Sequence, residues 1–387
     1  MNIKRIRLIV IIWIVVLGLL LSGCGAGLPP GSTLTTAATG VSTKTPRPTP
    51  TATKPAGSLN VVKIESVALS KNLIGEKTER TILVYLPPAY DTSTKRYPVV
   101  YFLPGFGDRS MDTSSEDINE LIQGGTIQEM IVVVVPGDNR LGGSFYVNSP
   151  VTGNWEDFVV QEVVGYVDNH YRTIARVESR GLSGHSMGGF GSLNIAMLHP
   201  DVFGAVYSLS PGLFDENGLA NSQMFNVEYT IQKFLDGQKA VLAKPEDQQL
   251  ESALSMQDYF STAYGLAFVP EPQKPPFYFD YPFSESNGNL VRDDTLWKRW
   301  DSGYGGIHEK VVRYKDNLLK LKGIVVDYGT NDVYKWIIQG CIYFDQQLTA
   351  AGIPHEMAVH DGDHQSQLGK RVLEHMLPFF SKLLVGE

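Results

Sequence analysis

One stretch constrains the fold more than any other, residues 178–200 with the sequence ESRGLSGHSMGGFGSLNIAMLHP. A short apolar rise leads into a tight turn, and a helical run of apolar residues then continues to His199-Pro200. Ser186 stands at the apex of this predicted strand–turn–helix unit, inside the pattern G-x-S-x-G. Gly184 and Gly188 leave room for a turn so sharp that the serine is forced into a strained backbone conformation. This context favours a nucleophilic serine over an idle serine in a glycine-rich turn.

A serine hydroxyl becomes a good nucleophile only when a base takes its proton and an acid orients that base. On sheets with this turn, the three groups follow one another as serine, then Asp or Glu, then histidine. Asp332 follows the predicted strand 323–329 and His364 follows the last predicted strand, 356–360. Both therefore lie at carboxyl ends of strands, so we predict Asp332 as the acid and His364 as the base.

Other side chains compete for these two roles. His360 is a second candidate base, but it ends its strand and is expected to face the core, whereas His364 lies deeper in the loop. Asp332 is preferred over Asp327, which lies within its strand, and over Asp361 and Asp363; a turn-forming role is the alternative for each aspartate. His185 precedes the serine and is expected to be a packed histidine that points away from the site. A zinc or calcium site at residues 360–364 would lack further ligands nearby, so no metal is predicted.

Two backbone N–H groups are expected to stabilise the oxyanion of the reaction. The turn directs the N–H of Met187 and the N-terminus of the following helix at the place where this charge would develop. The second N–H should come from the loop after the third strand, LPGFGD at residues 103–108. Because Gly105 allows a close approach of the backbone, we assign this second donor to Phe106.

Strands and helices alternate along most of the chain. Helices are expected at 155–170, 333–351 and 366–384, and strands at 59–69, 81–88, 97–104, 130–136, 205–211, 323–329 and 356–360. Such alternation predicts an α/β fold whose mostly parallel central sheet is flanked by helices. This alternation of strands and helices is interrupted between about residues 212 and 310. The interrupting segment has a polar helical part at 232–256 and an aromatic, proline-rich part at 270–283. We interpret this insertion as a cap over the serine, the alternative being a segment packed elsewhere for stability.

The N-terminal segment has the pattern of a targeting signal. Residues 1–23 contain three basic residues and then a short apolar run, which is typical of a signal peptide. Leu21-Ser22-Gly23-Cys24 resembles a bacterial lipobox, so Cys24 is the expected lipidation site; an uncleaved anchor or a plain secretory signal are alternatives. Residues 24–57 are rich in Thr and Pro and are predicted to be a tether, followed by the folded domain at 58–387. The expected location is the outer side of the cytoplasmic membrane.

Charge and cysteine content exclude several classes of protein. The formal net charge of −8 without basic clusters argues against nucleic acid and against an anionic membrane surface as partners. Two cysteines cannot form a disulfide framework or a cysteine-rich zinc site. The only membrane contact expected is the lipid anchor at Cys24.

Several motifs together resemble the esterase D family. This family groups S-formylglutathione hydrolases, feruloyl and acetyl-xylan esterases, enterobactin esterases and the antigen 85 mycolyltransferases. The resemblance is dense from about residue 64 to 211, thin near the C-terminus and absent from the insertion, and one departure is Pro104, where many relatives carry His or Asp. The matching motifs are VYLPPAYD, RYPVVYFLPGFG, GNWEDF, GLSGHSMGGFGSL, HPDVF, GTND and GDH.

The resemblance implies an α/β-hydrolase fold and a serine esterase that needs no cofactor. It assigns Ser186 as nucleophile, Asp332 as acid, His364 as base, and Phe106 and Met187 as oxyanion donors. The expected substrate is a carboxylic ester of a small molecule, a polysaccharide or a lipid. Acyl transfer to a sugar or lipid acceptor by the same triad is an alternative. A serine peptidase and a non-catalytic surface binding module are further alternatives.

Overall fold

The computed structural model describes residues 56–256 and 259–387. These residues belong to one compact unit, Lys54–Glu387. The predicted signal peptide (1–23), Cys24 and all but the last two residues of the predicted tether lie outside the described residues. In the described part, no helix combines the length and the apolar character needed to cross a membrane.

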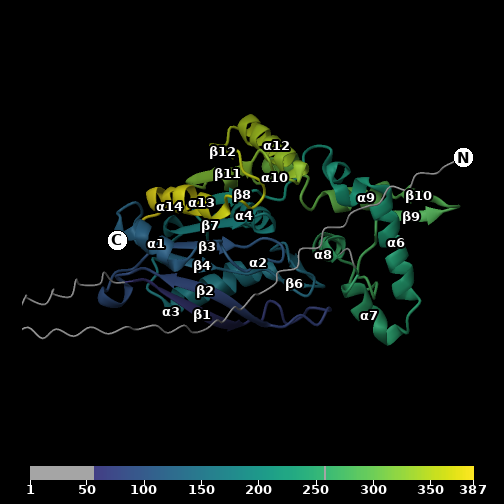
Figure 1. The fold of residues 1–387 in the computed structure, drawn as a ribbon, viewed down its shortest axis with the longest axis horizontal. Helices are drawn as coiled ribbons and strands as arrows, with labels where there is room; N and C mark the ends of the chain where they lie inside the picture. Colours follow the sequence, from purple (N-terminus) through teal and green to yellow (C-terminus); the bar gives the residue numbers. More distant parts are fainter. Residues whose placement is uncertain (1–55, 257–258) are drawn as a thin grey trace, which may run out of the picture. The chain divides into compact units, whose positions relative to one another are not determined.

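An eight-stranded sheet forms the centre of the structure, with the strand order β1-β2-β4-β3-β7-β8-β11-β12 (Figure 1). β2 pairs antiparallel with both of its neighbours and all other neighbouring pairs are parallel. The predicted α/β fold with a mostly parallel sheet is therefore confirmed. The strands are β1 (Ser58–Glu65), β2 (Glu79–Leu86), β3 (Val99–Leu103), β4 (Ile131–Val134), β7 (Arg180–His185), β8 (Ala205–Leu209), β11 (Gly323–Gly329) and β12 (Glu356–His360).

Helices cover both faces of this sheet, because its central strands are apolar on both sides. Val99 and Tyr101 of β3 belong to one apolar cluster, and Val100 and Phe102 belong to a second cluster across the sheet. The first cluster includes residues of α3 (Val164–His170), α4 (Met187–Leu198) and α12 (Lys335–Ala351). The second includes residues of α1 (Ser115–Gln123) and α14 (Leu377–Leu383).

Two of the predicted helices contain a π-helical middle part. The helix expected at 155–170 consists of α2 (Trp155–Asp157), the π-helix η2 (Phe158–Val163) and α3. The last helix is built in the same way from α13 (Leu368–Arg371), the π-helix η5 (Val372–Met376) and α14. A π turn widens the helix locally and so shifts its buried face, which a simple 3.6-residue period cannot reveal.

The insertion between residues 212 and 310 is mainly helical. The polar part expected at 232–256 forms two helices, which are separated at Pro245 because proline has no N–H and restricts the residue before it. The helices here are α5 (Gln223–Asn226), α6 (Glu228–Leu242), α7 (Glu246–Leu254), α8 (Tyr259–Phe268), α9 (Asp294–Asp301) and α10 (Ile307–Arg313). A hairpin joins β9 (Phe283–Ser286) to β10 (Asn289–Arg292), and α11 (Lys315–Leu318) leads back to the sheet.

Helix α8 was not predicted, because it is buried on nearly every side and shows no apolar stripe. Its buried residues run without interruption from Ser261 to Ala267. The fully buried Trp300 packs beside it, and the ring centroids of Trp300 and Tyr264 are 5.9 Å apart. The indole N–H of Trp300 donates to the carbonyl oxygen of Asp280 at 2.8 Å. The insertion is therefore packed around aromatic residues, which continue the apolar cluster on one face of the sheet.

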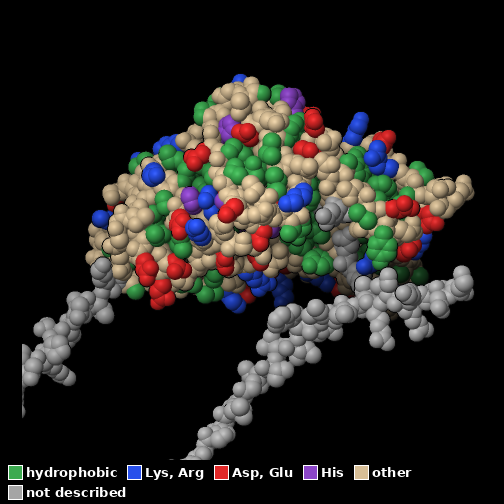
Figure 2. Space-filling view, turned by 45° about the horizontal axis from the view of Figure 1, so that its top comes forward, with side chains coloured by type: hydrophobic (Ala, Val, Ile, Leu, Met, Phe, Trp, Pro, Cys, Tyr) green, Lys and Arg blue, Asp and Glu red, His purple; other side chains and the backbone are tan. Residues whose placement is uncertain are grey.

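Short elements complete the described residues. They are η1 (Tyr90–Thr92), η3 (Val177–Ser179), η4 (Gly218–Asn221) and the hairpin of β5 (Asn148–Ser149) and β6 (Gly153–Asn154). On the face of the molecule shown in Figure 2, basic and acidic side chains are intermixed.

Gly188 lies so close to β3 that no side chain fits there. A Cβ at this position would be 1.8 Å from the carbonyl oxygen of Leu103, a backbone atom that cannot move alone. We expect Gly188→Ala to lower the free energy of unfolding by about 3 kcal/mol, measured by urea denaturation. Gly165→Ala is the matched control: nothing lies within 4 Å of its Cβ, so this helical change should stabilise by about 0.5–1 kcal/mol. Equal stability of the two variants would contradict the expectation.

Candidate active site

Ser186 is held in a strained conformation between β7 and α4. Its φ and ψ angles are 56° and −113°, values that a residue with a side chain rarely adopts. The N–H of Ser186 donates to the carbonyl oxygen of Leu209 at 2.9 Å, and its own carbonyl oxygen accepts from the N–H of Gly212 at 3.1 Å. These two hydrogen bonds hold the turn against the end of β8 and the segment after it, and Ser186 lines a pocket.

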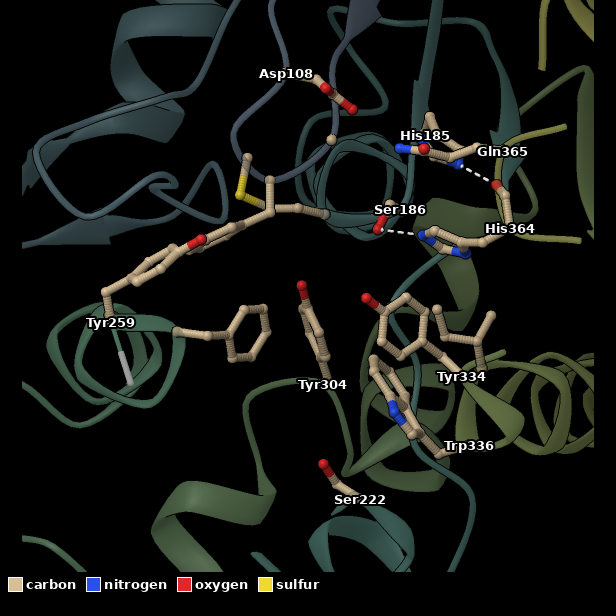
Figure 3. Close-up of a pocket in the computed structure, with 16 residues that line it drawn as sticks. Asp108, His185, Ser186, Ser222, Tyr259, Tyr304, Tyr334, Trp336, His364 and Gln365 are labelled. Atoms are coloured by element: carbon tan, nitrogen blue, oxygen red, sulfur yellow. Dashed lines mark hydrogen bonds between the residues drawn. The ribbon is translucent and has the colours of Figure 1, made fainter. Parts of the chain in front are cut away.

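The structure brings Ser186, His364 and Asp332 into one hydrogen-bonded line, and Figure 3 shows its first contact, between Ser186 and His364. The hydroxyl of Ser186 lies 2.9 Å from Nε2 of His364, and Nδ1 of His364 lies 2.7 Å from Oδ2 of Asp332. Asp332 is fully buried, and its Oδ1 accepts the backbone N–H of Tyr334 at 2.8 Å. An acceptor carboxylate on Nδ1 fixes the proton there, so Nε2 is free to accept the proton of the serine.

The competing base and the competing strand acid contact each other instead. Oδ2 of Asp327 accepts from Nε of Arg371 at 2.8 Å, and its Oδ1 is 3.5 Å from Nε2 of His360. Nδ1 of His360 accepts the N–H of Gly362 at 3.0 Å. Burial lowers the pKa of His360. His360 is therefore half-buried beside Asp327 and does not line the pocket of Ser186.

The two remaining acids shape the loop that carries His364. Asp363 accepts the backbone N–H groups of Gln365 and Ser366 at 3.0 and 2.7 Å, which is the turn-forming role considered for it. The carboxylate of Asp361 is exposed and accepts from the side chain of Gln367 at 2.9 Å.

His185 is packed as predicted, but it does not point away from the site. The side chain is 2% exposed and lines the same pocket as Ser186. Its Nε2 lies 2.8 Å from the carbonyl oxygen of His364, so this nitrogen carries the proton and donates (Figure 3). Burial, followed by the charge of nearby His364, lowers the pKa of His185 to about 4. Its contact with the base was missed because it joins residues 179 positions apart.

The depressed pKa of His185 predicts an acid-sensitive fold. An unfolded histidine takes up a proton below about pH 6.5, whereas folded His185 resists protonation until about pH 4. The contribution of His185 to the free energy of unfolding is therefore fully present above pH 6.5. It decreases by about 3 kcal/mol as the pH falls toward 4. His185→Gln keeps an N–H for the carbonyl of His364 but cannot titrate. Its free energy of unfolding should fall less over this range, as measured by urea denaturation at pH 7, 5.5 and 4; parallel pH curves would contradict this.

Phe106 and Met187, the two predicted oxyanion donors, both line the pocket with Ser186. Met187 is the first residue of α4, and the first N–H groups of a helix have no partner within the helix. The loop around Phe106 is fixed by the N–H of Gly107, which donates to the carbonyl oxygen of Gly142 at 2.7 Å. The helix N-terminus also adds positive potential at this place.

The pocket has a volume of about 480 Å³ and two chemically different sides. Asp108, His185 and Gln365 lie on one side of Ser186, and aromatic rings lie on the other (Figure 3). Burial raises the pKa of Asp108, partly offset by His364. The insertion contributes Ser222, Tyr259, Phe260 and Tyr304 to the lining, and the segment before and within α12 contributes Tyr334, Trp336 and Ile337.

Among the described residues, no group of three or more His, Cys, Asp or Glu side chains is arranged to hold a metal ion.

The sequence of this chain is similar to known esterase sequences. The sequence model of the Esterase family ("Putative esterase") matches residues 75–379. Esterase Rv1288 of Mycobacterium tuberculosis H37Rv is 32% identical over 135 residues, which are 33% of this chain and 28% of that protein. The chain thus spans well under half of the length of this curated relative.

Similar solved structures share the fold. A ferulic acid esterase covers 85% of this chain and 99% of its own, with 21% identity and a TM-score of 0.55. A fluorophosphonate-binding serine hydrolase of Staphylococcus aureus, FphF, covers 84% and 99%, with 17% identity and a TM-score of 0.52. S-formylglutathione hydrolase of Agrobacterium tumefaciens covers 86% and 97%, with 17% identity and a TM-score of 0.50. The α/β-hydrolase fold predicted from the resemblance is confirmed.

Proposed function

This chain belongs to the Esterase family, and from that premise we propose that it is a serine esterase that hydrolyses carboxylic esters through an acyl-enzyme on Ser186. The observation that carries the proposal is the line of two hydrogen bonds from Ser186 through His364 to Asp332. A packed histidine alone would not require a buried carboxylate on one nitrogen and a strained serine on the other.

The proposed reaction has two halves. Oγ of Ser186 attacks the ester carbonyl carbon while its proton passes to Nε2 of His364, and Asp332 stabilises the resulting imidazolium. The N–H groups of Phe106 and Met187 would hold the negative oxygen of the tetrahedral intermediate. When the C–O bond to the alcohol breaks, His364 returns the proton to the leaving oxygen. Water then repeats the sequence on the acyl-enzyme and releases the acid.

The aromatic side of the pocket supports an ester with an aromatic or apolar acyl group. Tyr304 and Trp336 stack with ring centroids 5.9 Å apart, and Tyr259 stacks on Phe106 at 5.8 Å. Flat rings are well suited to packing against another ring. The name of the similar ferulic acid esterase agrees with such a substrate.

We further propose that the enzyme acts outside the cytoplasmic membrane as a lipoprotein anchored at Cys24. The support is the lipobox-like sequence and the Thr/Pro-rich segment after it. Expression in a bacterial host should place the chain in the membrane fraction, whereas Cys24→Ala should abolish incorporation of labelled palmitate. Equal labelling of both proteins would argue against this anchor.

Covalent labelling tests the esterase proposal directly. A fluorophosphonate reagent should modify the full chain in detergent, and peptide mass spectrometry should place the adduct on Ser186. Ser222 lines the same pocket and is the matched competitor, so Ser222→Ala should still be labelled. An adduct on Ser222, or a folded protein that neither reacts nor hydrolyses p-nitrophenyl esters, would favour a binding module. Adding alcohol acceptors and analysing products separates hydrolysis from acyl transfer.

A further inference from the structure

The polar side of the pocket contains two hydrogen-bond acceptors that lack donors. Nδ1 of His185 is buried and has no hydrogen-bond partner among the described residues. Asp108 lies on the same side of the pocket (Figure 3), and both side chains come close to Gly105. A Cβ on Gly105 would be 3.2 Å from Oδ2 of Asp108 and 3.3 Å from Nδ1 of His185. Both acceptors therefore lie against Gly105, next to the loop of Phe106.

Nδ1 of His185 is an acceptor because of what the other nitrogen does. A carbonyl oxygen can only accept, so Nε2 must hold the ring proton in its 2.8 Å contact with His364. A neutral imidazole then has its lone pair on Nδ1. Leaving such a buried acceptor unpaired costs about 1–3 kcal/mol, and buried polar groups in native proteins rarely stay unpaired.

Asp108 is equally without a partner. No hydrogen bond or ion pair involves its carboxylate in the part of the chain that the structure describes, and it is the only carboxylate that lines the pocket there. The adjacent Arg109 does not neutralise it, because Nε of Arg109 donates to Asp138 at 3.0 Å. The carboxylate of Asp108 is half-buried and lines the pocket, so it is free to accept from a bound ligand, whereas Nδ1 of His185 is enclosed behind it.

We propose that the carboxylate of Asp108, beside the enclosed imidazole of His185, forms a subsite that accepts hydrogen bonds from a hydroxyl or ammonium group on the alcohol part of the ester. The subsite rests on the proposed esterase function and defines its alcohol specificity. It lies across Ser186 from the aromatic rings, so acyl and alcohol parts occupy opposite sides of the pocket. Because the carboxylate is unneutralised, the same subsite rejects an alcohol that carries a negative charge.

A purely electrostatic role for Asp108 is the competing explanation. Its charge acts on His364, so it could stabilise the imidazolium formed during every turnover. That role would change the rate for all esters by the same factor. A subsite changes the ratio of rates between esters, and this difference separates the two explanations.

Four benzoate esters with alcohols of similar size test the subsite: propyl, 2,3-dihydroxypropyl, 2-aminoethyl and carboxyethyl. Wild-type kcat/KM should be about tenfold to a hundredfold higher for the dihydroxy or amino ester than for propyl, as for hydrogen bonds to a charged acceptor, and lower for the carboxylate. In Asp108→Ala, the donor-to-propyl ratio should fall toward one. In Asp108→Asn, the carboxyethyl-to-propyl ratio should rise, a gain that misfolding cannot produce.

Asp91→Asn is the matched control, because Asp91 is exposed and does not line the pocket; all four ratios should stay at their wild-type values. Comparison of the 2,3-dihydroxypropyl ester with the 2-aminoethyl ester shows whether a hydroxyl or an ammonium donor is preferred. Equal wild-type rates, or Asp108 variants that slow all four esters by one factor, would overturn the subsite.

Binding to Ser186→Ala, measured by calorimetry, keeps the two proposals distinguishable. This variant cannot form an acyl-enzyme, so the dissociation constants report recognition alone. The donor esters should bind at least about tenfold more tightly than propyl benzoate. If this order holds but the wild type hydrolyses nothing, the esterase proposal fails and the subsite stands; if all four bind equally, the subsite fails.

Discussion

Ser186→Ala is expected to lower kcat for hydrolysis of p-nitrophenyl acetate by about 10⁴- to 10⁶-fold. Without Oγ there is no atom to form the acyl-enzyme, and only general binding and the oxyanion donors continue to assist water. The helix and sheet around the turn are unchanged, so the melting temperature should stay near the wild-type value. Steady-state kinetics and circular dichroism of the purified full chain check both statements.

His364→Ala should produce a loss of similar size, and the double variant should be no slower than either single one. The reason is that nucleophile and base act as a unit, so their effects do not add. His360→Ala is the matched control, since its ring lies beside Asp327 rather than Ser186. If His360→Ala removed the activity and His364→Ala did not, the assignment of the base would be wrong.

Asp332→Asn is expected to lower kcat by about 10³- to 10⁴-fold without unfolding the protein. An amide at this buried position can donate to Nδ1 of His364, which moves the ring proton to Nε2 and blocks its role as a base. The amide oxygen introduced in this variant can still accept the backbone N–H of Tyr334, so the conformation of the loop should be retained. The pH–rate profile and melting temperature should be recorded alongside kcat.

Asp327→Asn is the matched comparison in the neighbouring strand. Its carboxylate accepts from the buried side chains of Arg371 and Tyr207, so its loss leaves a buried cation without its partner. We expect a cost of about 3–5 kcal/mol in unfolding free energy but near-normal kcat for the folded fraction. If Asp327→Asn lowered kcat strongly and Asp332→Asn did not, Asp327 rather than Asp332 would be the acid that orients the base.

Much of the fold could be predicted because its signals are local. The fully apolar runs of β3 and β4 are typical of strands buried on both faces, and the turn at Ser186 requires glycines at fixed offsets. The order of serine, acid and base along the chain then reduced the site to a few candidates. Choosing between His360 and His364, however, depended on which way each side chain faces, and only the structure shows that.

The insertion was the least predictable part. Helix α8 has no periodic pattern because it is enclosed by aromatic residues from distant positions, such as Phe279 and Trp300. Tyr304 is positioned at the pocket by contacts of the same kind. The hydroxyl of Tyr264 accepts the backbone N–H of Tyr304 at 2.9 Å and donates to the carbonyl oxygen of Trp300 at 2.9 Å. Such packing has no signature in neighbouring residues.

The sequence by itself determined the sheet, the sharp turn at Ser186 and a short set of candidates for acid and base, because strand periods, glycine positions and loop order are properties of nearby residues. Only the tertiary structure decided that His364 meets Asp332, that His185 holds the backbone of His364, and that Asp108 and His185 both lie against Gly105. The physical reason is that hydrogen bonds and burial depend on distances in space between residues that are far apart along the chain.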